Sequence, residues 1–208
     1  MRKLNSPRLI ITVVLLAVAC GAIAANLGPD DQQISFTGAA GTTATDAVLP
    51  VVAYEPQSQR YLVVWAADDP DGEFSLHGQL LTGAGGVPLG TPFPIRPAVT
   101  DSTDDHNQPA IAVDEVRGRF LVVWSSDDLD PGAYEIYSQI VESDGTLVDL
   151  PQRLSDMGSN DADSAFDAVT PDVAWHPDLD AYVVVWAGDD DTGDLSDGRF
   201  ELYGQLVA

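Results

Sequence analysis

The sequence predicts an all-β fold built from three repeated sheets, and three observations carry that prediction. An apolar run that ends in Trp65 returns at Trp124 and Trp186, at spacings of 59 and 62 residues. The proline-led runs PVVAY, PAIAV and PDVAW keep the same two spacings. Short β-rich runs separated by Gly, Pro, Asp and Asn fill the rest, and no helical periodicity lasts longer than a turn after residue 24.

Each repeat contains four β-forming runs, labelled A to D. In the first repeat they are PVVAY (A), RYLVVW (B), FSLHGQLL (C) and FPI (D). The run ISF, before the first repeat, and QRL, after the second, are also of type D. A four-stranded antiparallel unit that recurs at about 60 residues is typical of β-propeller blades. The sequence therefore predicts a β-propeller-like domain over 25–208, with three four-stranded antiparallel blades in repeats 33–82, 91–142 and 150–207.

The apolar pattern predicts how each blade is buried. Run B is continuously apolar, as in a strand buried between neighbouring blades. Run C alternates, with Leu76, Gly78 and Leu80 on one face and His77 and Gln79 on the other. We expect the tryptophan of each repeat to pack between sheets, with one hydrogen-bond partner for its indole. His77 replaces a tyrosine of the other two repeats, which indicates a packing position.

The composite motif P-x-[VI]-A … [YF]-[LV]-VVW-x-x-DD … [HY]-[GS]-Q resembles a tandem repeat of secreted bacterial proteins. The resemblance covers residues 34–207 and implies propeller-type blades of surface or extracellular proteins. It implies no shared set of catalytic residues.

Three blades are too few to close a ring, which takes at least four. One solution is a homodimer in which two chains form a six-bladed ring and each lends its ISF run to the other. Another is that the chain is a fragment of a longer reading frame. A third is an open arc or solenoid of stacked units.

The first 24 residues have the layout of a secretory signal peptide. Three basic residues lie before or beside an apolar run over residues 9–19, and Ala22-Ile23-Ala24 supplies a cleavage motif. We therefore expect a secreted, periplasmic or cell-surface location. An uncleaved anchor is one alternative, and lipidation of Cys20, which would tether the chain to a membrane, is another. Because Cys20 is the only cysteine, the processed chain would contain neither a disulfide nor a cysteine-ligated zinc.

The chain is strongly acidic, with a formal net charge of −24. A field of this sign repels nucleic acid and attracts cations, and no basic patch exists to neutralise phosphates. In a propeller the B–C and D–A connections lie at the same end, and these connections hold 22 of the 33 acidic residues. We therefore expect one acidic rim.

Calcium is the hard cation that carboxylate-rich loops of exported proteins bind. The predicted metal or contact groups are the aspartates of the three B–C loops: Asp68, Asp69, Asp71, Asp127, Asp128, Asp130, Asp189, Asp190, Asp191 and Asp194. Asp46, Asp105 and Asp167, each four residues before a strand-A proline, are expected to cap turns. An alternative without any site is a lysine-poor acidic surface adapted to concentrated salt.

These features predict a non-enzymatic binding or adhesion module that depends on Ca²⁺ and binds an unidentified protein or carbohydrate. The alternatives are a carbohydrate-active hydrolase on a propeller scaffold and a purely structural surface repeat. A hydrolase should have one carboxyl with a raised pKa in one cleft, whereas a binding module should have equivalent sites in every repeat.

Overall fold

The computed structural model describes residues 32–35, 46–68, 73–96, 106–128, 132–160, 163–191 and 198–208, which all belong to one compact unit. The predicted signal peptide and Cys20 lie outside these residues. None of the described segments is a helix long and apolar enough to cross a membrane.

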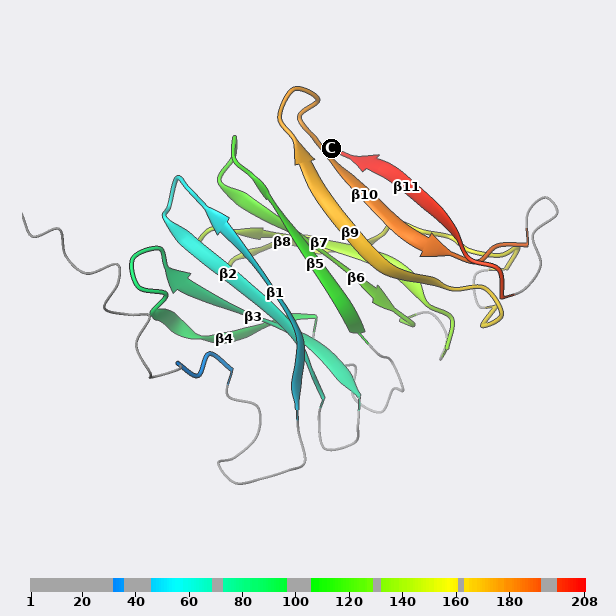
Figure 1. Ribbon diagram of the computed structural model, residues 1–208, viewed down its shortest axis with the longest axis horizontal. Coiled ribbons are helices and arrows are strands. Elements are labelled where there is room, and N and C mark those ends of the chain that lie inside the picture. Colours follow the sequence, from blue (N-terminus) through cyan, green and yellow to red (C-terminus); the bar gives the residue numbers. More distant parts are fainter. Residues whose placement is uncertain are drawn as a thin grey trace, which may run out of the picture. The chain divides into compact units, whose positions relative to one another are not determined.

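The described residues form three antiparallel sheets, whose strands follow one another in chain order (Figure 1). The first sheet contains β1 (Ala47–Glu55), β2 (Arg60–Asp68), β3 (Phe74–Thr82) and β4 (Pro88–Arg96). The second contains β5 (His106–Asp114), β6 (Arg119–Ser126), β7 (Glu135–Glu142) and β8 (Leu147–Arg153). The third contains β9 (Ala168–His176), β10 (Ala181–Gly188) and β11 (Glu201–Val207). These sheets are the three predicted blades, with strands A to D in order, so the all-β, propeller-like fold is confirmed.

The third blade and the ISF run differ from the simplest form of the prediction. Within the described residues the third blade has three strands, whereas the other two have four. Ile34 and Ser35 of the ISF run are not in a strand. A type-D run becomes a strand only by hydrogen-bonding to a type-C strand, as β4 does to β3. The first blade already has β4 in that position, so Ile34 and Ser35 lack such a partner in their own blade.

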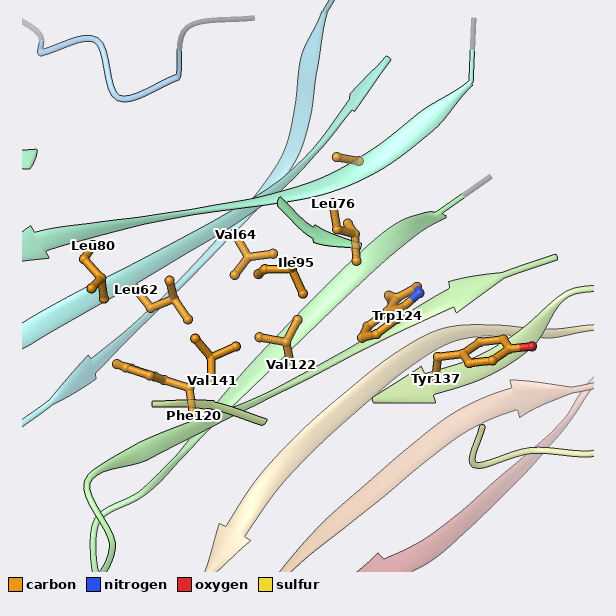
Figure 2. Packing of buried hydrophobic residues seen from close by; sticks show 11 residues of the cluster. Leu62, Val64, Leu76, Leu80, Ile95, Phe120, Val122, Trp124, Tyr137 and Val141 are labelled. Carbon is orange, nitrogen blue, oxygen red and sulfur yellow. The ribbon is translucent and has the colours of Figure 1, made fainter. Parts of the chain in front are cut away.

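Two apolar seams hold the blades together. At the first seam, Leu62 and Val64 of β2 pack with Ile95 of β4 against Phe120 and Val122 of β6, as Figure 2 shows. At the second seam, the opposite face of β6 packs against β10. Its members include Leu121, Val123, Tyr182, Val184 and Trp186. Alternate residues of β6 therefore serve opposite seams, which is why run B is apolar throughout.

Each repeated tryptophan is buried and stacks on the aromatic side chain opposite it on strand C. Trp65 stacks on His77 with ring centroids 6.0 Å apart, and Trp124 stacks on Tyr137 at 6.2 Å. Trp186 and Tyr203 repeat the pair at 6.4 Å. The packing role of His77 is thus confirmed. The expected hydrogen-bond partner of the indole was wrong, since no Nε1 of these tryptophans has one among the described residues.

The proline of each strand A lies at a β-bulge. The residues before the three prolines, Leu49, Gln108 and Thr170, have φ angles of 53°, 52° and 51°. The pairing of strands A and B shifts register at each of these places. Proline has no N–H to give to the ladder, and a bulge is where a strand tolerates that loss.

Candidate functional site

The B–C and D–A connections meet at one end of the blades, as the predicted acidic rim requires. The Asp68 N–H donates to the Asp46 carbonyl at 3.1 Å, and the Asp189 N–H donates to the Asp167 carbonyl at 2.9 Å. Each bond joins the start of strand A to the end of strand B in one blade. The geometric part of the prediction is therefore confirmed.

The first aspartate of each pair after strand B accepts a backbone N–H at the rim, within its own B–C loop in the second and third blades and at the start of strand A in the first. Asp127 Oδ2 accepts the Gly132 N–H at 2.8 Å, and Asp189 Oδ2 accepts the Gly198 N–H at 2.7 Å. In the first blade, Asp68 Oδ1 accepts the Asp46 N–H. The bonds of Asp127 and Asp189 span five and nine residues and hold their loops closed. These aspartates thus have a structural role. The sequence alone could not distinguish that role from metal binding, because both predict aspartates repeated at these positions.

Asp128 is engaged in an ion pair between blades. Its Oδ2 lies 3.0 Å from Arg96 Nη2, at the end of β4, and its Oδ1 accepts the Ser126 hydroxyl at 3.0 Å. The pair is mostly buried, so salt screens it less than a surface pair. Arg96 therefore supplies to Asp128 the positive charge that the sequence prediction had sought from a cation.

The predicted calcium site stays a prediction. Asp69, Asp71, Asp130 and Asp194 lie outside the described residues, whereas Asp190 is buried and Asp191 is exposed. In the parts of the chain that the structure describes, no three carboxylate or imidazole side chains are arranged to hold a metal ion. One observation still supports a bound cation near Asp189. Asp189 Oδ1 is buried and accepts no hydrogen bond from the described residues.

Calcium binding to these loops would raise thermal stability. A ligand at about 100 times its Kd adds about 2.7 kcal/mol to the free energy of unfolding. For a chain of this size that corresponds to a rise in Tm of about 5–11 °C. We expect millimolar CaCl₂ in low salt to produce this rise and EDTA to reverse it, as followed by circular dichroism. An equal rise with MgCl₂, or an unchanged Tm, would contradict a calcium site.

Asp167 lies where the second and third blades meet at the rim. It directly precedes β9, and its Oδ1 accepts the N–H of Tyr134, in the B–C loop of the second blade, at 3.1 Å. Next to it, the Ala168 N–H donates to the Tyr134 carbonyl at 2.7 Å. The side chain is half-buried. The turn-capping role expected for Asp167 is thus partly right, but the loop that it binds belongs to the neighbouring blade.

The pKa of Asp167 is raised. Burial is the main cause, and the nearby charges of Asp189 and Asp127 raise it further, against the hydrogen bond from Tyr134, which lowers it. We call Asp127, Asp167 and Asp189 the seam carboxylates. They come from the ends of β6 and β10 and the start of β9, so two blades build the group. A carboxyl whose pKa is raised by burial and by two neighbouring charges is a candidate proton donor to a bound molecule.

Glu135 also has a raised pKa, but its environment is different. It is buried, and burial is the main cause of the shift. Its oxygens accept the Ser155 hydroxyl and, at 2.8 Å, the Met157 N–H. Both partners follow β8 of the same blade. Glu135 therefore ties the D–A connection to β7. The sequence analysis missed this role, because the corresponding residue is Ser75 in the first repeat and Glu201 in the third.

The repeats are not equivalent at this rim. Asp46 corresponds to Asp167 in the sequence, yet its side chain is exposed. The difference arises because Asp167 has the B–C loop of a preceding blade beside it. Asp105, the third member of the set, lies outside the described residues. A binding module with equivalent sites would bury these aspartates equally in every repeat. The unequal burial of Asp46 and Asp167 instead fits a single site.

No family model matches the chain, and no curated protein matches it either. Solved structures do match. A Hadza microbial sialidase is 12% identical, with a TM-score of 0.52 over 72% of this chain and 33% of the sialidase. An N-acetylgalactosamine deacetylase from F. plautii is 16% identical (TM-score 0.49; 80% and 50% covered). An α-L-arabinofuranosidase from Lactobacillus brevis is 15% identical (TM-score 0.48; 77% and 52% covered).

The chain thus spans about half or less of the length of these solved structures. At this identity the likeness shows the fold. It also corrects one expectation: the chain was predicted not to be an enzyme, yet the solved structure that matches it with a TM-score of 0.52 is named as a sialidase, an enzyme. The inference from acidic repeats to a non-enzymatic module is therefore withdrawn. The repeat resemblance and the adhesion role gain no support from these comparisons.

Proposed function

We propose that the chain is a carbohydrate-active hydrolase, or a part of one, whose seam carboxylates act on a glycosidic bond. The observation that carries the proposal is the half-buried Asp167, with its raised pKa, at the rim between two blades. The sialidase that shares the fold supports the choice of substrate class.

Glycoside hydrolysis needs two carboxyl groups in different protonation states. One protonates the leaving oxygen, and the other, ionised, acts as nucleophile or activates water. Asp167 is the proposed general acid, because burial and two neighbouring charges favour its protonated form. The ionised partner would be an exposed carboxylate of the same rim. Asp127, on the neighbouring blade, is 3% exposed and its Oδ2 accepts the Gly132 N–H, so its proposed role is to favour the protonated form of Asp167 through its charge.

Asp167 suits this role better than Glu135. Glu135 is 3% exposed, and both of its oxygens accept hydrogen bonds from its own blade. A general acid must reach the oxygen that it protonates. Asp167 keeps part of its surface open to solvent, so a sugar at the rim could reach it.

The test is the substitution Asp167→Asn, assayed on aryl glycosides that include an aryl sialoside and an aryl arabinofuranoside. We expect kcat to fall about 10²–10⁴-fold with little change in KM, as for loss of a general acid. The alkaline limb of the wild-type pH–rate profile, where Asp167 loses its proton, should disappear from the residual activity of the variant.

The same substitution should not unfold the protein. A carboxyl whose pKa is raised on folding contributes stability at low pH that falls as pH rises from the usual aspartate value through the folded one. Asp167→Asn removes the free-energy cost of ionising this half-buried carboxyl at neutral pH. The Tm of the variant should therefore be at least that of the parent chain. The matched control is Asp178→Asn, an exposed aspartate in the A–B turn at the opposite end. Equal activity of the Asp167→Asn variant and the parent chain would contradict the proposal.

A further inference from the structure

The second blade has a serine where the other two blades have alanine. The residue after the repeated tryptophan is Ala66 in the first repeat, Ser125 in the second and Ala187 in the third. Ser125 lies near the end of β6 and is fully buried. Since alanine serves at the same position of two other blades, packing alone does not require the hydroxyl. The hydroxyl of Ser125 therefore points to a role that is specific to the second blade.

The Ser125 hydroxyl crosses the seam to the third blade. Period-two alternation places Ser125 on the face of β6 that carries Leu121 and Val123, which pack at the second seam. Its Oγ donates to the carbonyl of Ala168, the first residue of β9, at 2.8 Å. Ala168 is also fully buried, so the bond joins two groups that are shielded from water. A hydrogen bond in such a place is costly to lose, because water cannot replace it.

Ala168 directly follows Asp167, and the two residues make further bonds to the second blade. Asp167 Oδ1 accepts the Tyr134 N–H at 3.1 Å, and the Ala168 N–H donates to the Tyr134 carbonyl at 2.7 Å. Within the third blade, the Asp167 carbonyl accepts the Asp189 N–H at 2.9 Å. The segment Asp167–Ala168 is therefore held mainly by the neighbouring blade.

Ser125 is the contact of this segment that belongs to the interior of a sheet. Both bonds of Tyr134 come from the B–C loop, at the rim. Ser125 lies on β6, which pairs with β5 on one side and with β7 on the other. A strand paired on both sides moves less than a loop. The hydroxyl of Ser125 thus ties the segment to the rigid part of the second blade.

We propose that Ser125 is a positioning residue for Asp167, because its hydroxyl holds the Asp167–Ala168 segment against the second blade and keeps the Asp167 carboxyl half-buried. The inference rests on the proposed role of Asp167 as general acid. Without the bond, the segment can move away from β6 and the carboxyl becomes more hydrated. Hydration favours the ionised carboxylate, so the raised pKa of Asp167 falls toward the ordinary aspartate value.

The test titrates the Asp167 carboxyl by carbon-13 NMR with no substrate present. The variant is Ser125→Ala, which should fold because it restores the residue of the other two repeats. The signal is assigned by its loss in Asp167→Asn. We expect a lower pKa of Asp167 in the Ser125→Ala variant. The charged groups that face Asp167, the carboxylates of Asp127 and Asp189, remain in place.

A second readout is the hydrolysis of the aryl glycosides. Ser125→Ala should lower kcat about tenfold with little change in KM, as for the loss of one hydrogen bond that positions the general acid. The alkaline limb of the pH–rate profile should move to lower pH, in step with the pKa of Asp167. A residue that only stabilises the fold would lower the Tm without moving this limb.

Ser126→Ala is the matched control. Ser126 is equally buried, but alternation places it on the opposite face of β6, where its hydroxyl donates to Asp128 Oδ1 at 3.0 Å. This variant should leave the pKa of Asp167 unchanged. Ser125→Cys separates hydrogen bonding from packing, because a thiol fills the place of the hydroxyl but donates weakly. It should lower the pKa of Asp167 in the same direction as alanine does.

Three results would overturn the proposal. The pKa of Asp167 could be the same in Ser125→Ala and the parent chain, which would mean that the bond does not position the carboxyl. A parental pKa in Ser125→Cys would assign the effect to volume, and an equal fall in Ser126→Ala would assign it to general loosening of the blade. If the parent chain cleaves no glycoside, the proposed function fails, whereas the NMR titration still decides whether Ser125 positions Asp167.

Discussion

Replacing Trp124 with alanine should be the most destabilising single substitution in the described chain. Trp124 is fully buried at the seam between the first two blades, where it lies with Leu76 and Tyr137 (Figure 2). Truncation of a buried tryptophan costs about 3–5 kcal/mol, from lost transfer free energy and the cavity left behind. We expect Tm to fall by about 6–20 °C in a thermal melt followed by near-ultraviolet circular dichroism.

Trp124→Phe separates packing from hydrogen bonding. The indole Nε1 has no hydrogen-bond partner among the described residues, so phenylalanine removes volume but no bond. The ring can still stack on Tyr137, as the indole does. We expect less than half of the loss produced by alanine. Equal losses in the two variants would mean that the indole makes a polar contact essential to the seam, and a loss below 1 kcal/mol for alanine would mean that the seam contributes little.

The fold could be predicted from the sequence because its determinants repeat. Trp65, Trp124 and Trp186 recur with the same neighbours, and period-two alternation places their strands on known faces. Pro50 and its counterparts located strand A, although each strand begins three residues before its proline and the bulges at the prolines were not foreseen. Local pattern was sufficient for these elements, since each is decided within its own repeat.

The candidate site could be predicted only in part, because it depends on contacts between repeats. Asp46 and Asp167 occupy equivalent sequence positions, and only the neighbouring blade makes one exposed and the other half-buried. Asp128 looked like a metal ligand until Arg96, 32 residues earlier in the chain, was found beside it. Glu135 recurs as Glu201 but is replaced by Ser75 in the first repeat, so its role was not recognised from the sequence. A motif shows which side chains are present, whereas their pKa values follow from burial, which only the packed blades determine.

The A–B turns contain a further set of residues that the sequence analysis missed. Glu55, Asp114 and His176 occupy the same position in the three repeats, at the end of strand A. Glu55 accepts the N–H groups of Gln57 and Ser58, both at 2.6 Å. At His176, Nδ1 accepts the Leu179 N–H at 3.3 Å. Three different residue types thus serve one purpose, to satisfy the backbone of a tight turn, and this chemical variety hid the repeat.

Asp114 is the member whose loss should cost most. Its side chain is fully buried, and it accepts the N–H groups of Val116 and Arg117, both at 2.9 Å. It also pairs with the guanidinium groups of Arg117 at 2.9 Å and Arg119 at 3.3 Å. Burial by itself would raise the pKa of Asp114, but the hydrogen bonds from Arg117 and Val116 and the charge of Arg117 outweigh it and lower the pKa.

Asp114→Ala should therefore lower the free energy of unfolding by about 3 kcal/mol at pH 7, since it leaves Arg119 and two N–H groups without this acceptor, while Arg117 keeps its bonds to Asp180 at 2.6 Å. A carboxyl whose pKa is lowered on folding contributes stability above its unfolded pKa and loses it as pH falls through the folded value. The difference from the parent chain should accordingly shrink below about pH 4. Asp144→Ala is the matched control, because Asp144 Oδ1 accepts the Thr146 N–H at 2.9 Å in an exposed turn. Its loss should cost much less, because water replaces the lost hydrogen bond in an exposed turn. Equal costs for the two variants in urea unfolding would show that burial adds nothing to the Asp114 turn.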